Sequence, residues 1–270
     1  EISCSLVGSE MCIRDRHIER LLHSFFMDGG YAMEEKVLII IPAYNEEESI
    51  LSTYSTILEY NKTHTRQLTT IVINDGSTDN TENILVKNKI PHIKLIHNLG
   101  IGGAVQTGYK YAYEHGYDIA IQFDGDGQHD IHFVDDLVDP IVNKRANMTI
   151  GSRFVEGSTS EFKSTKARQM GIRMISGFIK IFTNVKLYDV TSGFRAIDRT
   201  LIQEFSMNYP TEYPEPISTT NILKHGKKVI EVPVKMNERQ GGVSSIHSWK
   251  NVYYMINVLM SIINIGIWRD

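Results

Sequence analysis

Five short runs of apolar, mostly β-branched residues recur in the first 152 residues, and four of them are followed by a polar or glycine-rich segment. Such runs are typical of strands that are buried on both faces of a parallel sheet. Segments with helical spacing separate the runs, so strand and helix alternate as βαβ units require. The pattern predicts an α/β fold with an open, mostly parallel twisted sheet flanked by helices. The expected strands are residues 36–42, 69–75, 93–98, 118–124 and 148–152.

Helix signals lie between these strands. The acidic run Glu46, Glu47 and Glu48 is expected in the first turn of a helix over residues 45–60, where it would complement the helix dipole. Further helices are expected to end near residues 88, 115, 144 and 225.

The composition of the 270 residues narrows the class of protein. Lys and Arg number 28 and Asp and Glu number 32, and the resulting net charge of −4 argues against nucleic acid as a partner held by a general basic field. The two cysteines, Cys4 and Cys12, both lie in the first dozen residues, so no disulfide framework holds the fold. A reducing, cytoplasmic location is therefore expected.

The chain is expected to have three parts. Residues 1–34 form an N-terminal extension that is predicted to be disordered, and residues 1–16 resemble a translated sequencing-adaptor read rather than natural protein. Residues 35–245 form the α/β domain. Residues 246–270 form a C-terminal amphipathic helix.

Polar clusters follow four of the predicted strands. In open α/β sheets, ligands bind beyond the carboxyl ends of the strands, so four clusters at one edge predict a binding site rather than four unrelated turns. The clusters are residues 42–46, 75–79, 98–100 and 124–130.

Asp124 and Asp126 are the most informative of these residues. A single glycine separates them, so both carboxylates can point the same way while the backbone turns closely around a ligand. Two carboxylates suit an oxygen-preferring divalent cation, Mg²⁺ or Mn²⁺, that keeps open positions for phosphate oxygens. The sequence leaves three alternatives for His129, which are a further ligand of the cation, a hydrogen-bond donor that supports a ligand, or neither role. An EF-hand is excluded, because the acidic spacing is wrong and no Glu closes a 12-residue loop.

Two nucleotide-binding motifs are not present. Residues 100–104 read Gly-Ile-Gly-Gly-Ala, but Val105 stands where a dinucleotide fingerprint needs its third glycine. No P-loop pattern occurs. The glycines at 100, 102 and 103 are instead expected to allow a tight turn and a close helix start.

Six segments in order, IPAYNEEESI, INDGSTDNT, NLGIGGAVQTG, FDGDGQHD, DVTSGFRA and ERQGGVSSI, resemble family 2 glycosyltransferases with the GT-A fold. The subgroup that they resemble is the dolichyl- or polyprenyl-phosphate mannosyltransferase-like enzymes. The resemblance covers roughly residues 36–263 and implies transfer of a sugar, with inversion, from a nucleotide-diphosphate donor. The implied acceptor is a polyprenyl phosphate or a glycan, in synthesis of cell-envelope polysaccharide or glycolipid.

The resemblance also implies roles for individual residues. Asp124 and Asp126 are the expected ligands of Mg²⁺ or Mn²⁺, which would neutralise the departing diphosphate. Arg239, in a glycine-flanked loop, is expected to add positive charge there. The expected catalytic residues are Asp126, Glu215 and Arg239. The expected nucleotide-sugar-binding residues are Pro42, Ala43, Tyr44, Glu46, Asp75, Gly102, Asp124 and Arg195.

On the acceptor side, this chain departs from its relatives at one position, and the need for a base depends on the acceptor. Relatives often carry a second Glu where this chain has Ile217, which leaves Glu215 as the remaining acid. A sugar hydroxyl needs a base, whereas a phosphate with a second pKa near 6 is already an anionic nucleophile. Arg153 and Arg195 are either cationic site residues or ordinary ion-pair arginines.

Residues 252–268 are apolar with a narrow polar stripe of Asn257, Ser261 and Asn264. Aromatic and basic flanks favour an amphipathic helix on a bilayer or on the catalytic domain, with a membrane span and a core helix as alternatives. A peripheral location at the inner membrane face follows, and a homo-oligomer is left open.

Two other functions compete with transfer. A sugar-nucleotide nucleotidyltransferase would share the sheet and the acidic site, but it needs a basic, glycine-rich loop where residues 42–48 are acidic. A non-catalytic nucleotide-sugar-binding module would not require the acidic pair.

Overall fold

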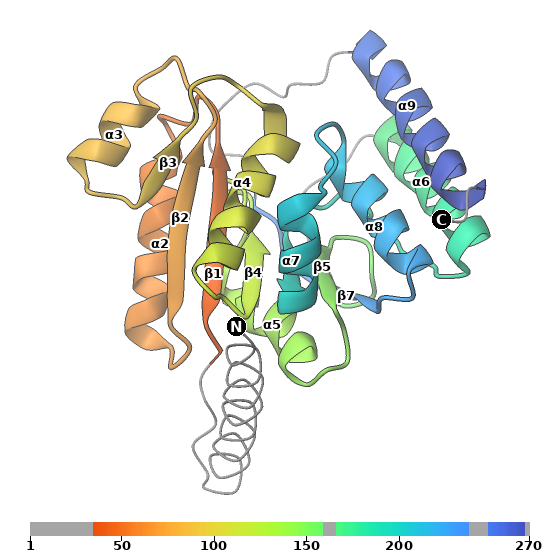
Figure 1. Ribbon diagram of the computed structural model, residues 1–270, viewed down its shortest axis with the longest axis horizontal. Helices are drawn as coiled ribbons and strands as arrows, with labels where there is room; N and C mark the ends of the chain where they lie inside the picture. Colours follow the sequence, from red (N-terminus) through yellow and green to blue (C-terminus); the bar gives the residue numbers. More distant parts are fainter. Residues whose placement is uncertain (1–34, 159–165, 238–247, 268–270) are drawn as a thin grey trace, which may run out of the picture. The chain divides into compact units, whose positions relative to one another are not determined.

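The computed structural model describes residues 35–158, 166–237 and 248–267, all of which belong to one compact unit (Figure 1). Predictions for residues 1–34 and for Arg239 lie outside the described residues. The described residues form a seven-stranded sheet with the strand order β3-β2-β1-β4-β6-β5-β7. Its strands are β1 (Val37–Ala43), β2 (Leu68–Asn74), β3 (His92–Lys94), β4 (Ile119–Gln122), β5 (Met148–Ser152), β6 (Arg195–Asp198) and β7 (Val229–Pro233).

The predicted mostly parallel sheet is confirmed. Strand β1 pairs in parallel with both β2 and β4, and β5 pairs in parallel with β7. Strand β6 is inserted between β4 and β5 and is antiparallel to both. Because of this reversal, β6 begins at the edge where β1, β2 and β4 end. The chain that enters β6 therefore joins the edge that carries the polar clusters.

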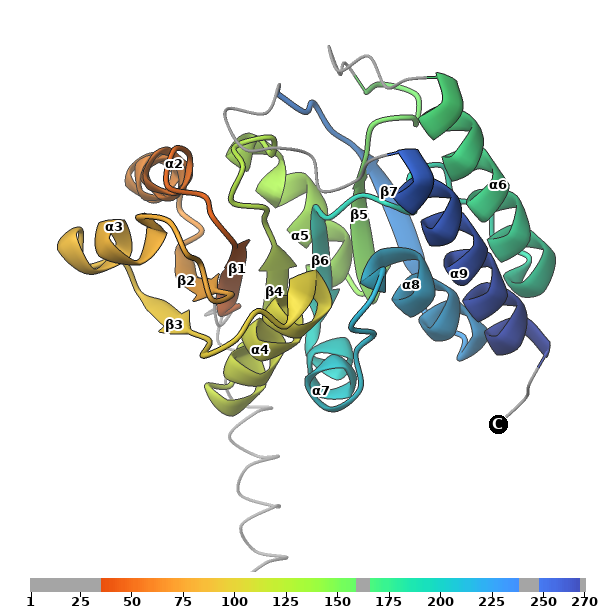
Figure 2. The ribbon, with the colours of Figure 1, turned by 90° about the horizontal axis from the view of Figure 1, so that it is seen from above.

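Helices cover both faces of the sheet, as Figure 2 shows from above. Helices α2, α3 and α5 lie on one face, and α4 and α7 lie on the other, with α6, α8 and α9 grouped beside β5 and β7. The helices are α2 (Ile50–Thr63), α3 (Thr81–Lys87), α4 (Gly100–Glu114), the short 3-10 helix η1 (Ile131–Phe133), α5 (Val134–Val142), α6 (Lys166–Thr183), α7 (Arg199–Met207), α8 (Pro214–Lys224) and α9 (Ser248–Ile267).

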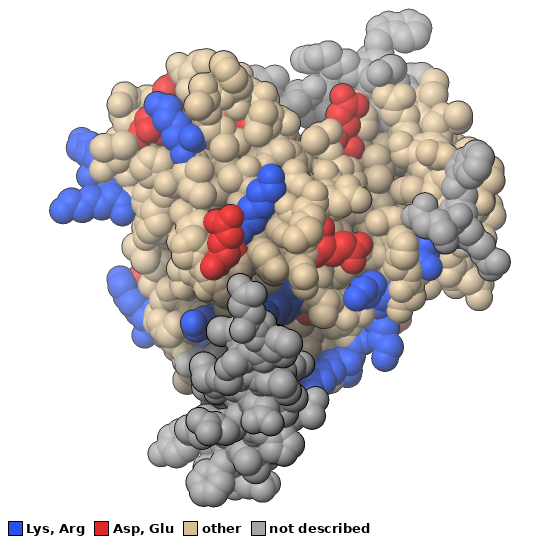
Figure 3. Space-filling view, in the orientation of Figure 1, with Lys and Arg blue, Asp and Glu red and all other residues tan. Residues whose placement is uncertain are grey.

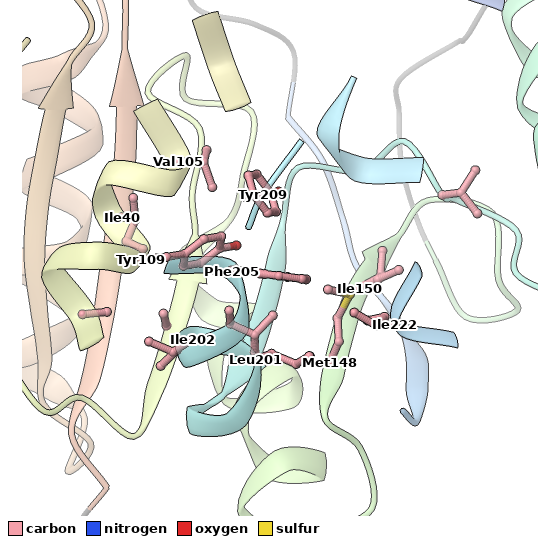
Figure 4. Packing of buried hydrophobic residues seen from close by; sticks show 14 of the residues in the cluster. Ile40, Val105, Tyr109, Met148, Ile150, Leu201, Ile202, Phe205, Tyr209 and Ile222 are labelled. Carbon is pink, nitrogen blue, oxygen red and sulfur yellow. The ribbon is translucent and has the colours of Figure 1, made fainter. Parts of the chain in front are cut away.

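The alternation of side chains along β1 builds two hydrophobic cores. Leu38 and Ile40 point into the core under α4 and α7, and Ile39 and Ile41 point into the core under α2 and α5. All seven residues of β1 are buried, as expected for a central strand with helices on both sides. Figure 4 shows the first core, where Tyr109 of α4 meets aromatic rings near the end of α7.

Helix α2 begins at Ile50, later than the start predicted at residue 45. Asn45 has a positive φ of 58°, which a helix does not allow. Its Oδ1 accepts hydrogen bonds from the backbone N–H groups of Thr78 and Asp79, at 2.8 and 3.3 Å. The prediction that the acidic run 46–48 occupies the first helical turn is therefore wrong, because the chain is tied to the neighbouring loop instead.

The C-terminal helix α9 is present and packs against α6 and α8. Val258 and Ile262 are fully buried in the core that these helices share. None of the helices in the described ranges 35–158, 166–237 and 248–267 is long and apolar enough to cross a membrane.

Charged side chains of both signs are interspersed over the face shown in Figure 3.

Candidate active site

All four of the predicted polar segments meet at the carboxyl edge of the sheet, the fourth of them through the contact of Leu99 with Asp75. The backbone N–H of Asp75, just after β2, donates to the carbonyl of Ala43 at 2.9 Å. On the other side of β1, a Cβ placed on Gly125 would lie 3.3 Å from the carbonyl oxygen of Pro42. The end of β1 therefore separates Asp75 from the acidic segment by the width of one strand.

Asp75 is buried, with 3% of its surface exposed. Its Oδ1 accepts a hydrogen bond of 2.7 Å from the backbone N–H of Leu99, just before α4. Burial raises the pKa of Asp75 above its ordinary value, and the backbone hydrogen bonds from Leu99 and Gly100 offset only part of that rise. A buried carboxylate with a raised pKa is suited to a ligand that brings its own hydrogen-bond donors.

The segment after β1 is held by the loop after β2. Asn45 donates its backbone N–H to Ser77, and Glu46 donates its backbone N–H to Thr81, both at 3.0 Å. Oε2 of Glu46 accepts from the hydroxyl of Ser49 at 2.8 Å. Tyr44 is about half exposed at the edge. The structure thus places the predicted nucleotide-binding residues 42–46 on a braced loop at the edge, and their contact with a nucleotide stays a prediction.

Asp124 and Asp126 follow β4 on a turn that is anchored to α2. The hydroxyl of Thr53 donates to the carbonyl of Gly125 at 3.1 Å. The side chain of Asp124 is one-third exposed, whereas Asp126 is buried and its Oδ1 accepts from the backbone N–H of Gln128 at 3.0 Å. One carboxylate therefore faces outward and the other is fixed in its own turn.

The chemistry of these two carboxylates fits a divalent cation such as Mg²⁺ or Mn²⁺. Both offer hard oxygen ligands, and a cation that binds nucleotide phosphates needs only one or two protein carboxylates. No group of three or more His, Cys, Asp or Glu side chains that could hold a metal occurs in the part of the chain that the structure describes. Two carboxylates would leave coordination positions of the cation open for substrate oxygens.

His129 lies behind Asp124. Its Nε2 is 3.1 Å from Oδ2 of Asp124, which is ion-pair distance when the ring is protonated, although the ring N–H is not aligned for a hydrogen bond. The ring is buried and stacks on Phe194, with centroids 4.8 Å apart. Of the alternatives left by the sequence, this position favours a supporting group that holds Asp124.

The segment that enters β6 brings Gly193 against the acidic pair. A Cβ on Gly193 would lie 2.6 Å from Oδ2 of Asp124, so any larger residue at this position would require the Asp124 carboxylate to move.

Arg195, two residues later, is fully buried and points into the protein. Its guanidinium donates to the carbonyls of Val190, Ser192 and Glu215 and to the hydroxyl of Thr219, at 2.6–2.9 Å. These bonds tie the segment before β6 to the start of α8. The predicted contact of Arg195 with the donor stays a prediction.

Gln122 is a residue that the sequence analysis missed. It is buried on β4, and its Nε2 lies 3.4 Å from Oδ1 of Asp124 and 3.5 Å from Oε1 of Glu215. Its Oε1 has no hydrogen-bond partner among the described residues. The signal was available, because Gln122 is the one polar residue in an apolar run and stands two positions before Asp124, on the same side of the strand.

Glu215 stands at the start of α8 and is partly buried. Burial raises its pKa, and the nearby guanidinium of Arg195 counteracts that rise. Through Gln122, the structure brings Glu215 to the same edge as Asp124, although the two residues are far apart in the sequence.

Of the two alternatives for Arg153, a cationic site residue or an ion-pair arginine, the structure supports the ion pair. Its guanidinium makes two hydrogen bonds to the buried carboxylate of Asp189, at 2.7 and 2.8 Å. This pair joins the segment after β5 to the segment that leads into β6.

Gly102, predicted to bind the donor, packs the start of α4 against another loop. A Cβ at this position would overlap the carbonyl oxygens of Pro210 and Thr211. That loop leads directly into α8 and Glu215, so the glycine sets how closely α4 approaches the segment that carries the acid.

Several known proteins are similar to this chain in sequence. The sequence profile of Glycosyl transferase family 2 matches residues 38–205. A UDP-N-acetylglucosamine–dolichyl-phosphate N-acetylglucosaminyltransferase of Methanococcus voltae is 31% identical over 222 residues, covering 75% of this chain and 86% of the relative. An undecaprenyl-phosphate mannosyltransferase of Micrococcus luteus is 28% identical over 224 residues, covering 78% of this chain and 87% of the relative. A polyprenol monophosphomannose synthase of Mycolicibacterium smegmatis is 27% identical, covering 78% and 81%.

A solved structure shares the fold. Glucosyl-3-phosphoglycerate synthase from Mycobacterium tuberculosis, crystallised with Mn²⁺, UDP and glucosyl-3-phosphoglycerate, superposes with a TM-score of 0.62 at 18% identity. The match covers 87% of this chain and 81% of that one. At this identity the likeness shows the fold alone, which is the GT-A fold.

Proposed function

Since the chain belongs to Glycosyl transferase family 2, we propose that it moves a sugar from a nucleotide-diphosphate donor to a polyprenyl phosphate, with inversion at the anomeric carbon. The observation that most supports this proposal is that Asp124 lies at the carboxyl edge of the sheet between Asp75 on one side and Glu215 on the other. Relatives that act on dolichyl and undecaprenyl phosphate support the choice of acceptor. A lipid acceptor would bring the reaction to a membrane surface.

The donor would lie over the end of β1. Asp75 offers buried carboxylate oxygens to the N–H and O–H donors of a nucleobase or ribose, and the loop 42–46 would flank it. Asp124 and Asp126 would hold Mg²⁺ or Mn²⁺, which supplies a Lewis acid for the leaving diphosphate. Gln122 and His129 would keep Asp124 in place.

Replacing Asp75 with asparagine should weaken nucleotide binding without weakening the fold. Because the pKa of Asp75 is raised in the folded protein, its ionised form costs stability above its unfolded pKa, and a neutral amide removes that cost. The amide oxygen can still accept from Leu99. We expect an unchanged or higher melting temperature at pH 7, and roughly tenfold weaker binding of UDP or GDP, because a charge-assisted hydrogen bond is lost. The measurement is the thermal shift caused by each nucleotide.

The matched control for this variant is Asp118→Asn. Asp118 precedes β4 at the opposite edge of the sheet, and its side chain is partly exposed. Its variant should keep the nucleotide-induced shift of the wild type. An undiminished shift in the Asp75 variant would contradict the proposed donor site.

On the acceptor side, a lipid phosphate would act as its own nucleophile. Its second pKa is about 6, so it is dianionic at pH 7 and no base need remove a proton. Glu215 would then shape the acceptor pocket, whereas with a hydroxyl acceptor its raised pKa would suit a general base.

The experiment that tests the proposed function measures transfer of labelled sugar from a panel of nucleotide-diphosphate sugars, with Mn²⁺, to a short polyprenyl phosphate and to the matching polyprenol. Transfer to the phosphate alone is the expected result. Formation of a nucleotide sugar and pyrophosphate from a sugar phosphate and a nucleoside triphosphate, without sugar transfer, would indicate a nucleotidyltransferase instead.

In this assay Glu215→Gln is expected to lower transfer to the phosphate by less than about tenfold, because no proton is removed by the enzyme. The rate should rise with pH through the second phosphate pKa near 6 in the wild type and in the variant. A loss of about 10² to 10⁴-fold, together with a flattened pH profile in the variant, would show that Glu215 is a base and that the acceptor is a hydroxyl.

A further inference from the structure

Tyr213 stands directly before Pro214 and Glu215 and has a left-handed backbone, with φ and ψ both at 51°. A bulky side chain makes this conformation unfavourable, and the residue before a proline favours an extended backbone. The position is also unusual, because Tyr213 caps the start of α8, where the capping residue normally has extended angles. The backbone of Tyr213 is therefore held against its local preferences.

The other non-glycine residues with a positive φ in the described part of the chain have simpler explanations. Three of them lie just after the last residue of α3, α5 or α6, where a left-handed residue commonly ends a helix, and these are Lys89, Lys144 and Asn184. The fourth is Asn45, and asparagine tolerates this conformation. Local strain such as that of Tyr213 persists only where the surrounding structure imposes it, and it is often found at functional sites.

The loop that leads to Tyr213 is fixed at both ends. At its start, the ring of Tyr209 is buried and packs edge-on against Tyr109 of α4, with centroids 5.3 Å apart (Figure 4). The loop then lies on the start of α4, where a Cβ on Gly102 would come within 2.6 Å of Cα of Thr211. At its end, the ring of Tyr213 is partly buried against the same hydrophobic core. Tyr213 therefore cannot relax to an extended backbone without the loss of these contacts.

The carboxylate of Glu215 is tied to the backbone at the start of α8. It accepts a hydrogen bond from the N–H of its own residue, and its Oε1 lies 3.5 Å from Nε2 of Gln122. The carbonyl of Glu215 accepts from the buried guanidinium of Arg195 at 2.9 Å. Because carboxylate and backbone are tied together, the direction in which α8 leaves Tyr213 sets where this acid lies.

We propose that Tyr213 is a positioning residue, whose left-handed backbone starts α8 in the direction that holds the Glu215 carboxylate against Gln122 and so keeps this negative charge away from an anionic acceptor. The choice of a phosphate as the acceptor comes from the proposed function, and a displaced carboxylate would repel that phosphate. With an extended Tyr213, the helix would start in another direction, and the carboxylate would lose the amide of Gln122.

The test compares Tyr213→Gly with Tyr213→Val. Both variants lose the aromatic ring, but glycine adopts the left-handed backbone freely, whereas β-branched valine resists it. The first measurement is kcat/KM for transfer to polyprenyl phosphate, well below the melting temperature of each variant. We expect the Val variant to be at least about tenfold less active than the Gly variant. Should valine prevent folding, Tyr213→Ala gives the same comparison with a smaller difference.

A double substitution shows whether the effect passes through the acid. In a Glu215→Gln background no carboxylate can be displaced, so the Val and Gly variants of Tyr213 should differ by less than about threefold in kcat/KM. The matched control is Lys144→Val compared with Lys144→Gly. Lys144 has a φ of 55° and precedes β5 at the opposite edge of the sheet. This pair imposes the same strain away from the site, so it should differ in melting temperature but not in transfer.

A second measurement does not depend on transfer. Carbon-13 NMR follows the titration of the Glu215 carboxyl group, whose signal is the one that Glu215→Gln removes. Burial raises the pKa of Glu215 in the wild type. The Gly variant of Tyr213 should keep this raised pKa, and the Val variant should return the pKa toward its ordinary value, because the displaced carboxylate reaches solvent.

Equal kcat/KM in the Gly and Val variants, or an equal pKa of Glu215 in both, would overturn the proposal. A loss caused by valine that persists in full in the Glu215→Gln background would also contradict it, since the effect would then not pass through the acid. If the wild type transfers no sugar to polyprenyl phosphate, the proposed function fails, and the NMR titration alone decides the role of Tyr213.

Discussion

Replacement of Asp126 by asparagine is expected to lower sugar transfer by about a thousandfold or more. Asparagine keeps the shape of the side chain and the oxygen that accepts from Gln128, but it removes the negative charge that would hold the cation. The Lewis acid is worth several kcal/mol at the leaving diphosphate, and each 1.36 kcal/mol is tenfold in rate. The measurement is the transfer rate at saturating donor and Mn²⁺, with the melting temperature as a check on the fold.

Asp130→Asn is the matched control. Asp130 belongs to the same acidic cluster, but its side chain accepts from the backbone N–H of His132 at the start of η1. Asparagine caps a helix about as well as aspartate, because its amide oxygen can accept the same hydrogen bond, so this variant should change stability by less than about 0.5 kcal/mol and should keep its activity. Full turnover by the Asp126 variant would refute the role assigned to the acidic pair.

The second large effect is on stability. Arg195→Met should lower the free energy of unfolding by about 3 kcal/mol or more. The variant removes a buried guanidinium and leaves the carbonyls of Val190 and Ser192 without the hydrogen bonds that it donates to them. Each buried group left unsatisfied costs about 1–3 kcal/mol. Urea unfolding followed by circular dichroism measures the loss.

Arg199→Met provides the comparison. Arg199 is an exposed arginine whose ion pair with Asp118 lies in solvent, so its replacement should change stability by less than about 1 kcal/mol. If the Arg195 variant is as stable as the wild type and instead loses UDP binding, the guanidinium contacts the donor, as the sequence resemblance implies.

The central strands were predictable because they are apolar on both faces. Strands β1 and β2 are nearly fully buried, and each is followed by polar residues at the shared edge. Parallel pairing then brings those residues together without further information. This is why Asp75 and the segment after β4 could be assigned to one edge from the sequence.

The part of the candidate site around β6 and α8 was harder to predict. Strand β6 is four residues long and carries Arg195 and Asp198 at its ends, so it lacks the apolar run of a central strand. Its position depends on antiparallel pairing with β4, where Arg195 lies opposite Gln122. Only such long-range pairing shows that Arg195 points inward and that Gln122 joins Asp124 to Glu215.

The start of α2 shows a second limit. An acidic first turn is a good local signal, yet the side chain of Asn45 is bound by the loop after β2. A contact between segments so distant in the chain outweighs a local preference of a few tenths of a kcal/mol.

The antiparallel ladder between β4 and β6 has a mechanical consequence. It joins the strands β1 to β4, whose ends would hold the donor, to the part of the chain from β5 onward, which would shape the acceptor side, by backbone hydrogen bonds across the middle of a single sheet. Two parts of a chain that share one continuous sheet cannot move apart about a hinge, whereas lobes that are joined only by linkers can. We therefore expect substrates to enter and leave through movements of the loops and side chains at the carboxyl edge, while the sheet itself stays rigid.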